Sequence, residues 1–361
     1  MSPIIQPTCL PMLIGSLPLD DHPAASRLVM DYTPAIPLWV QLPVFAQEGM
    51  VPQFLPGMPG AVSRDGKTFI DTAADTFDGE LLAFFEDYMA VSEAPEQLAD
   101  SRFALTAATG IGVNTLLNTL SRLETAPMAI KGQVTGPVTF CTGVKDQDGR
   151  AIFYNETLRD AAVKHLALNA RWQIRTLSGP GCLVIVFIDE PALAGFGSSE
   201  LISISKQEIL ACLKEVVDAI HGDGGLAGIH VCANTDWSLV LESGVDIINF
   251  DAHAYFDRFI LYGDQIRTFL DAGGLLAWGI VPTLKPEEIQ RETVDSLHAG
   301  LMERFRQVEA LGVSAATIRR QSFITPSCGL GSLSLDLATR VLTLTRGLSN
   351  AIRQAIALQN A

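Results

Sequence analysis

The chain has 361 residues, 48% of them hydrophobic, and its 40 acidic against 25 basic residues give a formal net charge of −15. This size can bury a large core, as one big α/β domain or two smaller ones. The acidity and the lack of a basic patch argue against nucleic acid or an anionic membrane surface as a partner. Its six cysteines are too few for a disulfide framework, residues 1–19 do not resemble a signal peptide, and no apolar span reaches membrane length, so we expect a cytoplasmic protein.

Short apolar runs alternate with longer helical patterns along the chain. The runs predict strands at 11–15, 36–41, 128–134, 182–188, 226–231, 245–250, 275–280 and 321–325. The helical patterns predict helices at 160–177, 206–221, 237–242, 286–311 and 334–358. Eight strands alternating with helices favour a (β/α)8 TIM barrel over an open doubly wound sheet, and no glycine-rich nucleotide motif follows the first strand.

The stretch 42–127 is too long for one connection between a strand and the next helix. It begins with several prolines and glycines and continues into an acidic helical pattern around 78–92. We interpret it as an insertion over one end of the barrel, either a cover or partner surface or simply an elaborated loop with a helix. The whole chain, 1–361, is predicted to form a single barrel domain.

Four residues that can bind a metal lie at or just after the ends of three predicted strands. His230 and Cys232 are two residues apart, so a strand directs both to one side. Asp251 and Cys328 each stand where a later strand passes into its loop, which is where barrel enzymes place their chemistry. Two thiolates, an imidazole and a carboxylate suit Zn²⁺, although a buried histidine and buried cysteines without a metal are the alternative.

The ligand set indicates the chemistry such a zinc would support. Two thiolates already donate strongly to the ion, so it would generate hydroxide poorly. It is better suited to hold an incoming thiol as a thiolate near neutral pH. The expected reaction is therefore alkyl transfer to sulfur rather than hydrolysis.

Two further features could bind the rest of a substrate. Asp189 and Glu190 end a strongly apolar strand, where one could hold a substrate ammonium group, although a helix cap or a buried pair explains such residues equally well. Ile14, Gly15 and Ser16 end the first predicted strand and offer N–H groups and a hydroxyl to a carboxylate, although such a segment taken alone indicates only a turn.

Taken together, these motifs resemble the C-terminal catalytic barrel of cobalamin-independent methionine synthase, within the uroporphyrinogen decarboxylase-like superfamily. They occur in the family's order over nearly the whole chain. The matching segments are 14–16, 134–139, 188–193, 230–232, 246–251 and 328–330.

The resemblance implies a role for each matching residue. His230, Cys232 and Cys328 would be zinc ligands and catalytic residues. Asp251 stands where the family has a glutamate ligand, so its shorter carboxylate would reach less far, and His253 is a possible substitute.

The resemblance also implies how homocysteine, the substrate that becomes methionine, would be bound. Asp189 matches the residue that binds its ammonium group, and residues 14–16 match the contacts to its carboxylate. Glu48 is our candidate for a further substrate-binding acid.

The methyl donor is the point at which this chain departs from the family. Full-length members carry a second, N-terminal barrel, and their aromatic and arginine signature for the folate donor is not evident at 140–145. Single-barrel "core" methionine synthases are similar in this respect and take the methyl group from a methylated corrinoid, either methylcobalamin or a corrinoid protein. We therefore expect a methylcorrinoid donor that is not tightly bound, with the insertion as a docking surface.

Three other functions remain open. One is a corrinoid methyltransferase with a different thiol acceptor such as coenzyme M. The second is a metal-free lyase of the uroporphyrinogen decarboxylase type, which would need more cationic residues than the 25 present. The third is a zinc-binding interaction protein.

Overall fold

A computed structural model describes residues 5–64, 67–179, 181–196 and 203–359. Its centre is a curled sheet of seven parallel strands in the order β1-β9-β8-β7-β6-β5-β4. These strands are β1 (Leu10–Pro11), β4 (Ala129–Thr135), β5 (Leu183–Asp189), β6 (Leu226–Val231), β7 (Ile247–Phe250), β8 (Leu275–Val281) and β9 (Ser322–Pro326).

The segment 36–42 contacts both edges of this sheet without forming a regular strand. Its Leu38 bridges Lys131 of β4, and its Gln41 bridges Ser16, beyond the end of β1. Pro37 cannot donate a backbone hydrogen bond, which limits regular pairing here. The structure therefore has an α/β fold whose central sheet has seven regular strands among the described residues, where the sequence predicted eight, and the first strand is shorter than expected.

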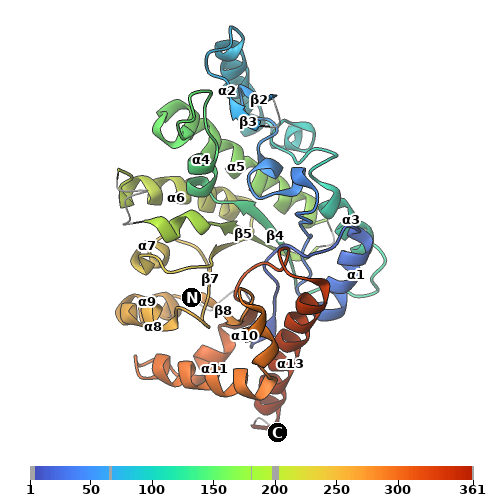
Figure 1. Ribbon diagram of the computed structural model, residues 1–361, viewed down its shortest axis with the longest axis vertical. Helices are drawn as coiled ribbons and strands as arrows, with labels where there is room; N and C mark the ends of the chain where they lie inside the picture. Colours follow the sequence, from blue (N-terminus) through green and yellow to red (C-terminus); the bar gives the residue numbers. More distant parts are fainter. Residues whose placement is uncertain (1–4, 65–66, 180, 197–202, 360–361) are drawn as a thin grey trace.

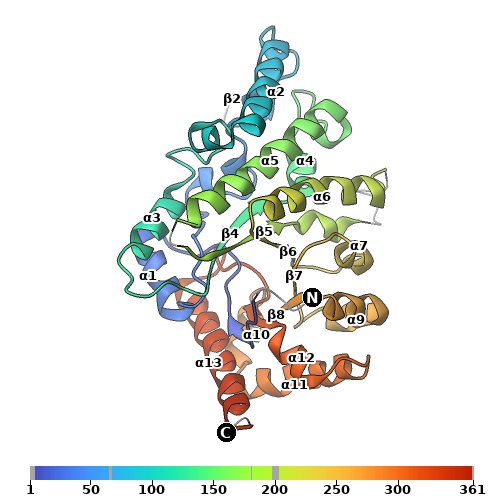
Figure 2. The same ribbon diagram turned by 180° about the vertical axis from the view of Figure 1, so that it is seen from behind.

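Helices surround the sheet, as Figures 1 and 2 show. The α-helices are α1 (His22–Tyr32), α2 (Phe77–Glu93), α3 (Ile111–Leu120), α4 (Pro137–Gly143), α5 (Glu156–Leu177), α6 (Lys206–Gly222), α7 (Trp237–Leu241), α8 (Phe256–Phe259), α9 (Gly263–Asp271), α10 (Pro286–Arg291), α11 (Val294–Glu309), α12 (Ala315–Arg320) and α13 (Leu335–Gln359). The 3-10 helices are η1 (Ala46–Glu48), η2 (Pro52–Phe54), η3 (Pro95–Asp100), η4 (Ile152–Tyr154), η5 (Pro191–Gly195) and η6 (Ile260–Tyr262). No helix within the described residues is both long enough and apolar enough to cross a membrane.

The single helix predicted at 286–311 is in fact two helices. Glu292 has an extended backbone after α10, and Thr293 then caps α11. The Thr293 side chain accepts from the N–H of Ser296, and the Ser296 hydroxyl accepts from the N–H of Thr293. This reciprocal cap begins a new helix inside a continuous helical pattern.

The insertion is shorter than the predicted 42–127. Helix α3 packs beside α1 in the ring around the sheet, so the inserted part ends near residue 110. It contains a hairpin of β2 (Ala61–Arg64) and β3 (Lys67–Ile70) and helix α2, at the upper end of the molecule in Figure 1. The predicted acidic helix corresponds to α2.

Gly112 allows α3 to approach the segment 36–42, and it provides a test of this packing. A Cβ at this position would collide with the carbonyl oxygen of Val40. We expect Gly112→Ala to lower the free energy of unfolding by about 1–3 kcal/mol, because the backbone itself must move. Urea denaturation measures the change. Gly79→Ala in α2 is the matched control, since its Cβ would meet nothing within 4 Å, and it should stabilise by about 0.5–1 kcal/mol.

Two apolar clusters form the core. The smaller one fills the inside of the curled sheet with residues such as Met12, Ile185 and Phe323. The larger one lies between the sheet and the surrounding helices. The inner cluster leaves the carboxyl ends of the strands to polar side chains, and the candidate site lies at those ends.

Candidate metal centre

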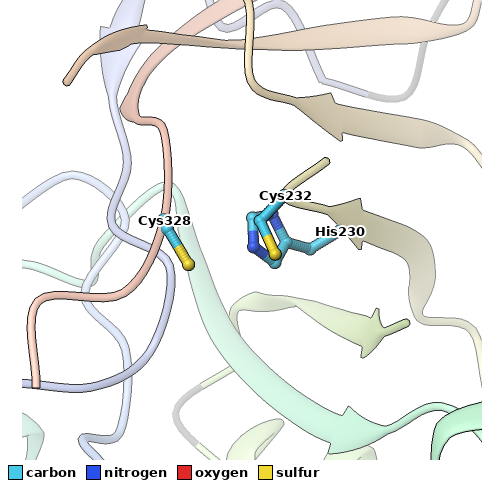
Figure 3. A group of neighbouring side chains, drawn as sticks. All are labelled: His230, Cys232 and Cys328. Carbon is cyan, nitrogen blue, oxygen red and sulfur yellow. The ribbon is translucent and has the colours of Figure 1, made fainter. Parts of the chain in front are cut away.

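His230, Cys232 and Cys328 come together at the carboxyl ends of the strands. Their potential ligand atoms all lie within 4.8 Å of one another, in the one such group of three or more found among the described residues. Figure 3 shows Cys328 reaching from the loop after β9 toward Cys232 and His230 at the end of β6. Ligand atoms of a tetrahedral zinc lie roughly 3.5–3.8 Å apart, so only small side-chain movements separate this cluster from that geometry.

The hydrogen bonds of His230 leave one ring nitrogen ready to bind a metal. Asn249 donates its amide group to Ala277 O and Thr325 Oγ1, both at 2.8 Å, so its Oδ1 faces His230 Nδ1 as an acceptor. Nδ1 therefore carries the proton, and Nε2 is a buried nitrogen without a hydrogen-bond partner. A ligating histidine usually has its other nitrogen held in this way. Asn249 is not among the site residues predicted from the sequence, although a polar residue inside an apolar strand is a usable signal.

The two thiols have opposite electrostatic character in the absence of a metal. The neighbouring Cys328 thiol stabilises the Cys232 thiolate and lowers the pKa of Cys232, with a further contribution from His230. Interaction with that thiolate raises the pKa of Cys328, as does burial. One thiolate and one thiol share the cluster, and a bound cation would favour the loss of the second proton.

Asp251, the fourth predicted ligand, lies outside the group. It is buried, and its Oδ1 accepts from the N–H of Ala254 at 2.8 Å. Burial raises its pKa to about 6, and the negative charge of Cys232 adds to the shift. His253, the suggested substitute, has its Nε2 3.9 Å from Glu292 Oε1 and is also outside the group. The group therefore offers three candidate ligand atoms, which would leave one position of a tetrahedral site open.

The loop that carries Cys328 is held from both sides. Ser327 donates its N–H to Val281 O at 2.9 Å. Further along, the N–H groups of Leu330 and Gly331 reach the carbonyl oxygen and the hydroxyl of Ser16, at 3.0 and 3.2 Å. These bonds place the turn at 14–16 next to the metal ligands.

Asp189 has a buried carboxylate, and one of its oxygens accepts no hydrogen bond. Its Oδ1 is buried without a hydrogen-bond partner, and it lies on the same sheet face as His230, with which it pairs in register. Burial raises the pKa of Asp189, while the positive charge of Lys131 lowers it. Such a group gains most from a cationic partner.

Both carboxylate oxygens of Glu190, in contrast, accept hydrogen bonds within the protein. Its carboxylate accepts from the N–H groups of Val138 and Thr139, at 2.8 and 2.9 Å, and from the Thr139 hydroxyl at 2.7 Å. Burial raises its pKa to about 7, although these hydrogen bonds favour the charged form. Glu190 therefore caps the start of α4, and a Cβ at Gly136 would overlap it.

We expect Glu190→Gln to destabilise the fold by about 1–3 kcal/mol. The amide group of glutamine must turn one NH₂ toward the N–H groups of Val138 and Thr139, which loses an acceptor in a buried place. The midpoint of urea denaturation measures this. Glu287→Gln, at an exposed position in α10, should change the midpoint by less than about 0.5 kcal/mol.

The turn at 14–16 has the donors that a carboxylate requires. The N–H groups of Gly15 and Ser16 donate no hydrogen bond within the described part of the chain, whereas the N–H of Leu17 reaches Gln41 O at 3.1 Å. Ile14 and Gly15 are buried, and Ser16 is half-buried. Two free N–H groups beside the candidate metal ligands form a suitable anion site.

Glu48 is buried and already has partners. One oxygen lies 2.7 Å from His22 Nε2, and the other accepts from the N–H of Leu42 at 2.8 Å. In this arrangement Glu48 fixes the loop after the segment 36–42. A substrate contact would have to use its remaining lone pairs, so its predicted binding role stays a prediction.

Comparisons with known proteins add little to this picture. No protein-family model and no curated protein matches the chain. Among solved structures, the chain is similar to a B12-independent methionine synthase from Shewanella sp. W3-18-1 in complex with selenomethionine, with 19% identity and a TM-score of 0.46. The match covers 68% of this chain and 66% of that one.

Proposed function

We propose that this protein is a zinc-dependent methyltransferase that methylates the thiol of homocysteine to give methionine. The observation that carries the proposal is the meeting of a ring nitrogen of His230 and the thiols of Cys232 and Cys328 within 4.8 Å. A donor set of two sulfurs and one imidazole fits Zn²⁺. The buried, unpaired oxygen of Asp189 nearby supports an amino acid as the acceptor.

Zinc bound at this site would supply a positive charge that holds the substrate sulfur as a thiolate near neutral pH. The chain itself would orient the rest of the substrate. Asp189 would accept hydrogen bonds from the ammonium group, and the N–H groups of Gly15 and Ser16 would donate to the carboxylate. Fixing both ends of the amino-acid head aims the sulfur at the incoming methyl group, and such orientation lowers the barrier by several kcal/mol.

We propose a methylated corrinoid, free or on a separate protein, as the methyl donor. The proposal rests on residues 140–145, Phe-Cys-Thr-Gly-Val-Lys, which lack the aromatic and arginine pattern of the folate-using enzymes. We also propose that the chain is a single closed barrel of the core type that acts in the cytoplasm. The segment 36–42, which bridges both sheet edges, supports closure.

A thiol acceptor without an amino group, such as coenzyme M, is less compatible with these residues. It would leave the buried Asp189 carboxylate without a cationic partner. A decarboxylase of a substrate with many carboxylates would need several cations at the strand ends, where the named site residues are two thiols, carboxylates and a single histidine.

The test is methyl transfer from methylcobalamin to L-homocysteine, with methionine measured by mass spectrometry, in zinc-loaded and zinc-free protein. We expect transfer only with zinc. Methyltetrahydrofolate serves as the competing donor, and transfer from it alone would refute the corrinoid part of the proposal. Zinc binding without transfer from either donor would contradict the enzymatic function and favour a zinc-binding interaction protein.

A further inference from the structure

A buried lysine lies beneath the candidate site. Lys131 of β4 has no exposed surface. Its Nζ donates to the carbonyl oxygen of Ile14, and it lies 3.4 Å from Gln133 Oε1 and 4.6 Å from the centroid of the Phe187 ring. No carboxylate of the described residues lies within 4.0 Å of it.

This position is costly for a lysine. Burial lowers the pKa of Lys131 to about 8, and the charge of Asp189 opposes that shift, so the side chain is still mostly protonated near neutral pH. A buried charge without an ion-pair partner destabilises a core in which an apolar residue would pack well. A lysine at this buried position is therefore better explained by its hydrogen bond to Ile14 than by packing.

The geometry of a peptide unit connects this hydrogen bond to the site. The carbonyl of Ile14 and the N–H of Gly15 belong to one planar, trans peptide group, so they point in opposite directions. A cation on the Ile14 oxygen fixes that plane and directs the Gly15 N–H away from the lysine. It also polarises the peptide, which makes the N–H a stronger donor. The Gly15 N–H is one of the two free donors described above.

We propose that Lys131 is a positioning residue that aims and strengthens the N–H donors at 14–16 for the carboxylate of an amino-acid thiol. The inference rests on the proposed function and adds the means by which the acceptor's carboxylate is recognised. The lysine acts through the Ile14 peptide, and its charge also partly offsets the negative charge of the buried Asp189.

The test compares two thiols that differ only in the carboxylate, L-homocysteine and 3-mercaptopropylamine. Their affinities for zinc-loaded protein are measured by calorimetry, without any methyl donor. We expect Lys131→Met to weaken homocysteine binding about tenfold and to change 3-mercaptopropylamine binding by less than about twofold. Lys214→Met, at an exposed position of α6, is the control and should change neither.

The affinities of the same two thiols are also measured with Lys131→Gln, whose amide can still donate to the Ile14 carbonyl oxygen. This variant replaces Lys131→Met in the test if the methionine variant does not fold. An equal loss for both thiols, or no loss for either, would overturn the positioning role while the proposed function stands. A parent protein that binds neither thiol would refute the proposed function and this inference with it.

Discussion

Replacing Cys328 by serine is expected to remove most zinc binding and to abolish methyl transfer while the fold survives. A serine hydroxyl stays protonated near neutral pH and is a poor zinc ligand, so only His230 and Cys232 would remain of the group. We expect zinc affinity to fall at least about 100-fold and transfer at least about 1000-fold. Zinc content by mass spectrometry and methionine formation measure the two effects.

The fold should tolerate this change because Cys328 is half-buried in a loop held by other bonds. Its neighbours Ser327 and Leu330 keep their backbone hydrogen bonds to Val281 and Ser16. We expect the Tm of the zinc-free variant to stay within about 3 °C of the zinc-free parent. Cys182→Ser, just before β5, is the control and should leave zinc content unchanged. Full zinc content in Cys328→Ser would exclude Cys328 as a ligand.

Asp189→Asn is expected to have opposite effects on binding and on stability. The neutral amide cannot pair with an ammonium group, so we expect KM for homocysteine to rise about 100-fold, with zinc content unchanged. The variant also no longer buries an unpaired carboxylate. Its free energy of unfolding should therefore stay equal or rise by about 1–2 kcal/mol. Steady-state kinetics and urea denaturation measure the two quantities.

The neighbouring residue provides the matched comparison. Glu190→Gln should lower stability and leave KM nearly unchanged, because Glu190 holds α4 rather than substrate. If Asp189→Asn instead lost stability and zinc together, Asp189 would be a structural residue. Identical behaviour of the two variants would contradict the separate roles assigned to them.

The sequence was sufficient for the elements and for the placement of the strongest candidate residues. Apolar runs and helical patterns depend on neighbours a few residues apart, so they predicted the strands from β4 to β9 and most of the long helices. The spacing of His230 and Cys232 put both on one face for the same local reason. The segment 36–42 and the break at Thr293 differed because proline and a helix cap override the hydrophobic pattern.

Only the tertiary structure decided which side chains meet. His230 and Cys328 are 98 residues apart in the sequence, and they come together because the sheet curls. The residue pattern alone did not separate Asp189 from Glu190, and only the resemblance singled out Asp189. In the structure, Glu190 accepts hydrogen bonds from the start of α4, whereas Asp189 Oδ1 has no hydrogen-bond partner. The same holds for Asp251, whose Oδ1 accepts from the N–H of Ala254, and for Lys131, whose proposed role depends on the Ile14 peptide across the sheet. Hydrogen bonds between distant segments are set by packing, and local patterns do not encode them.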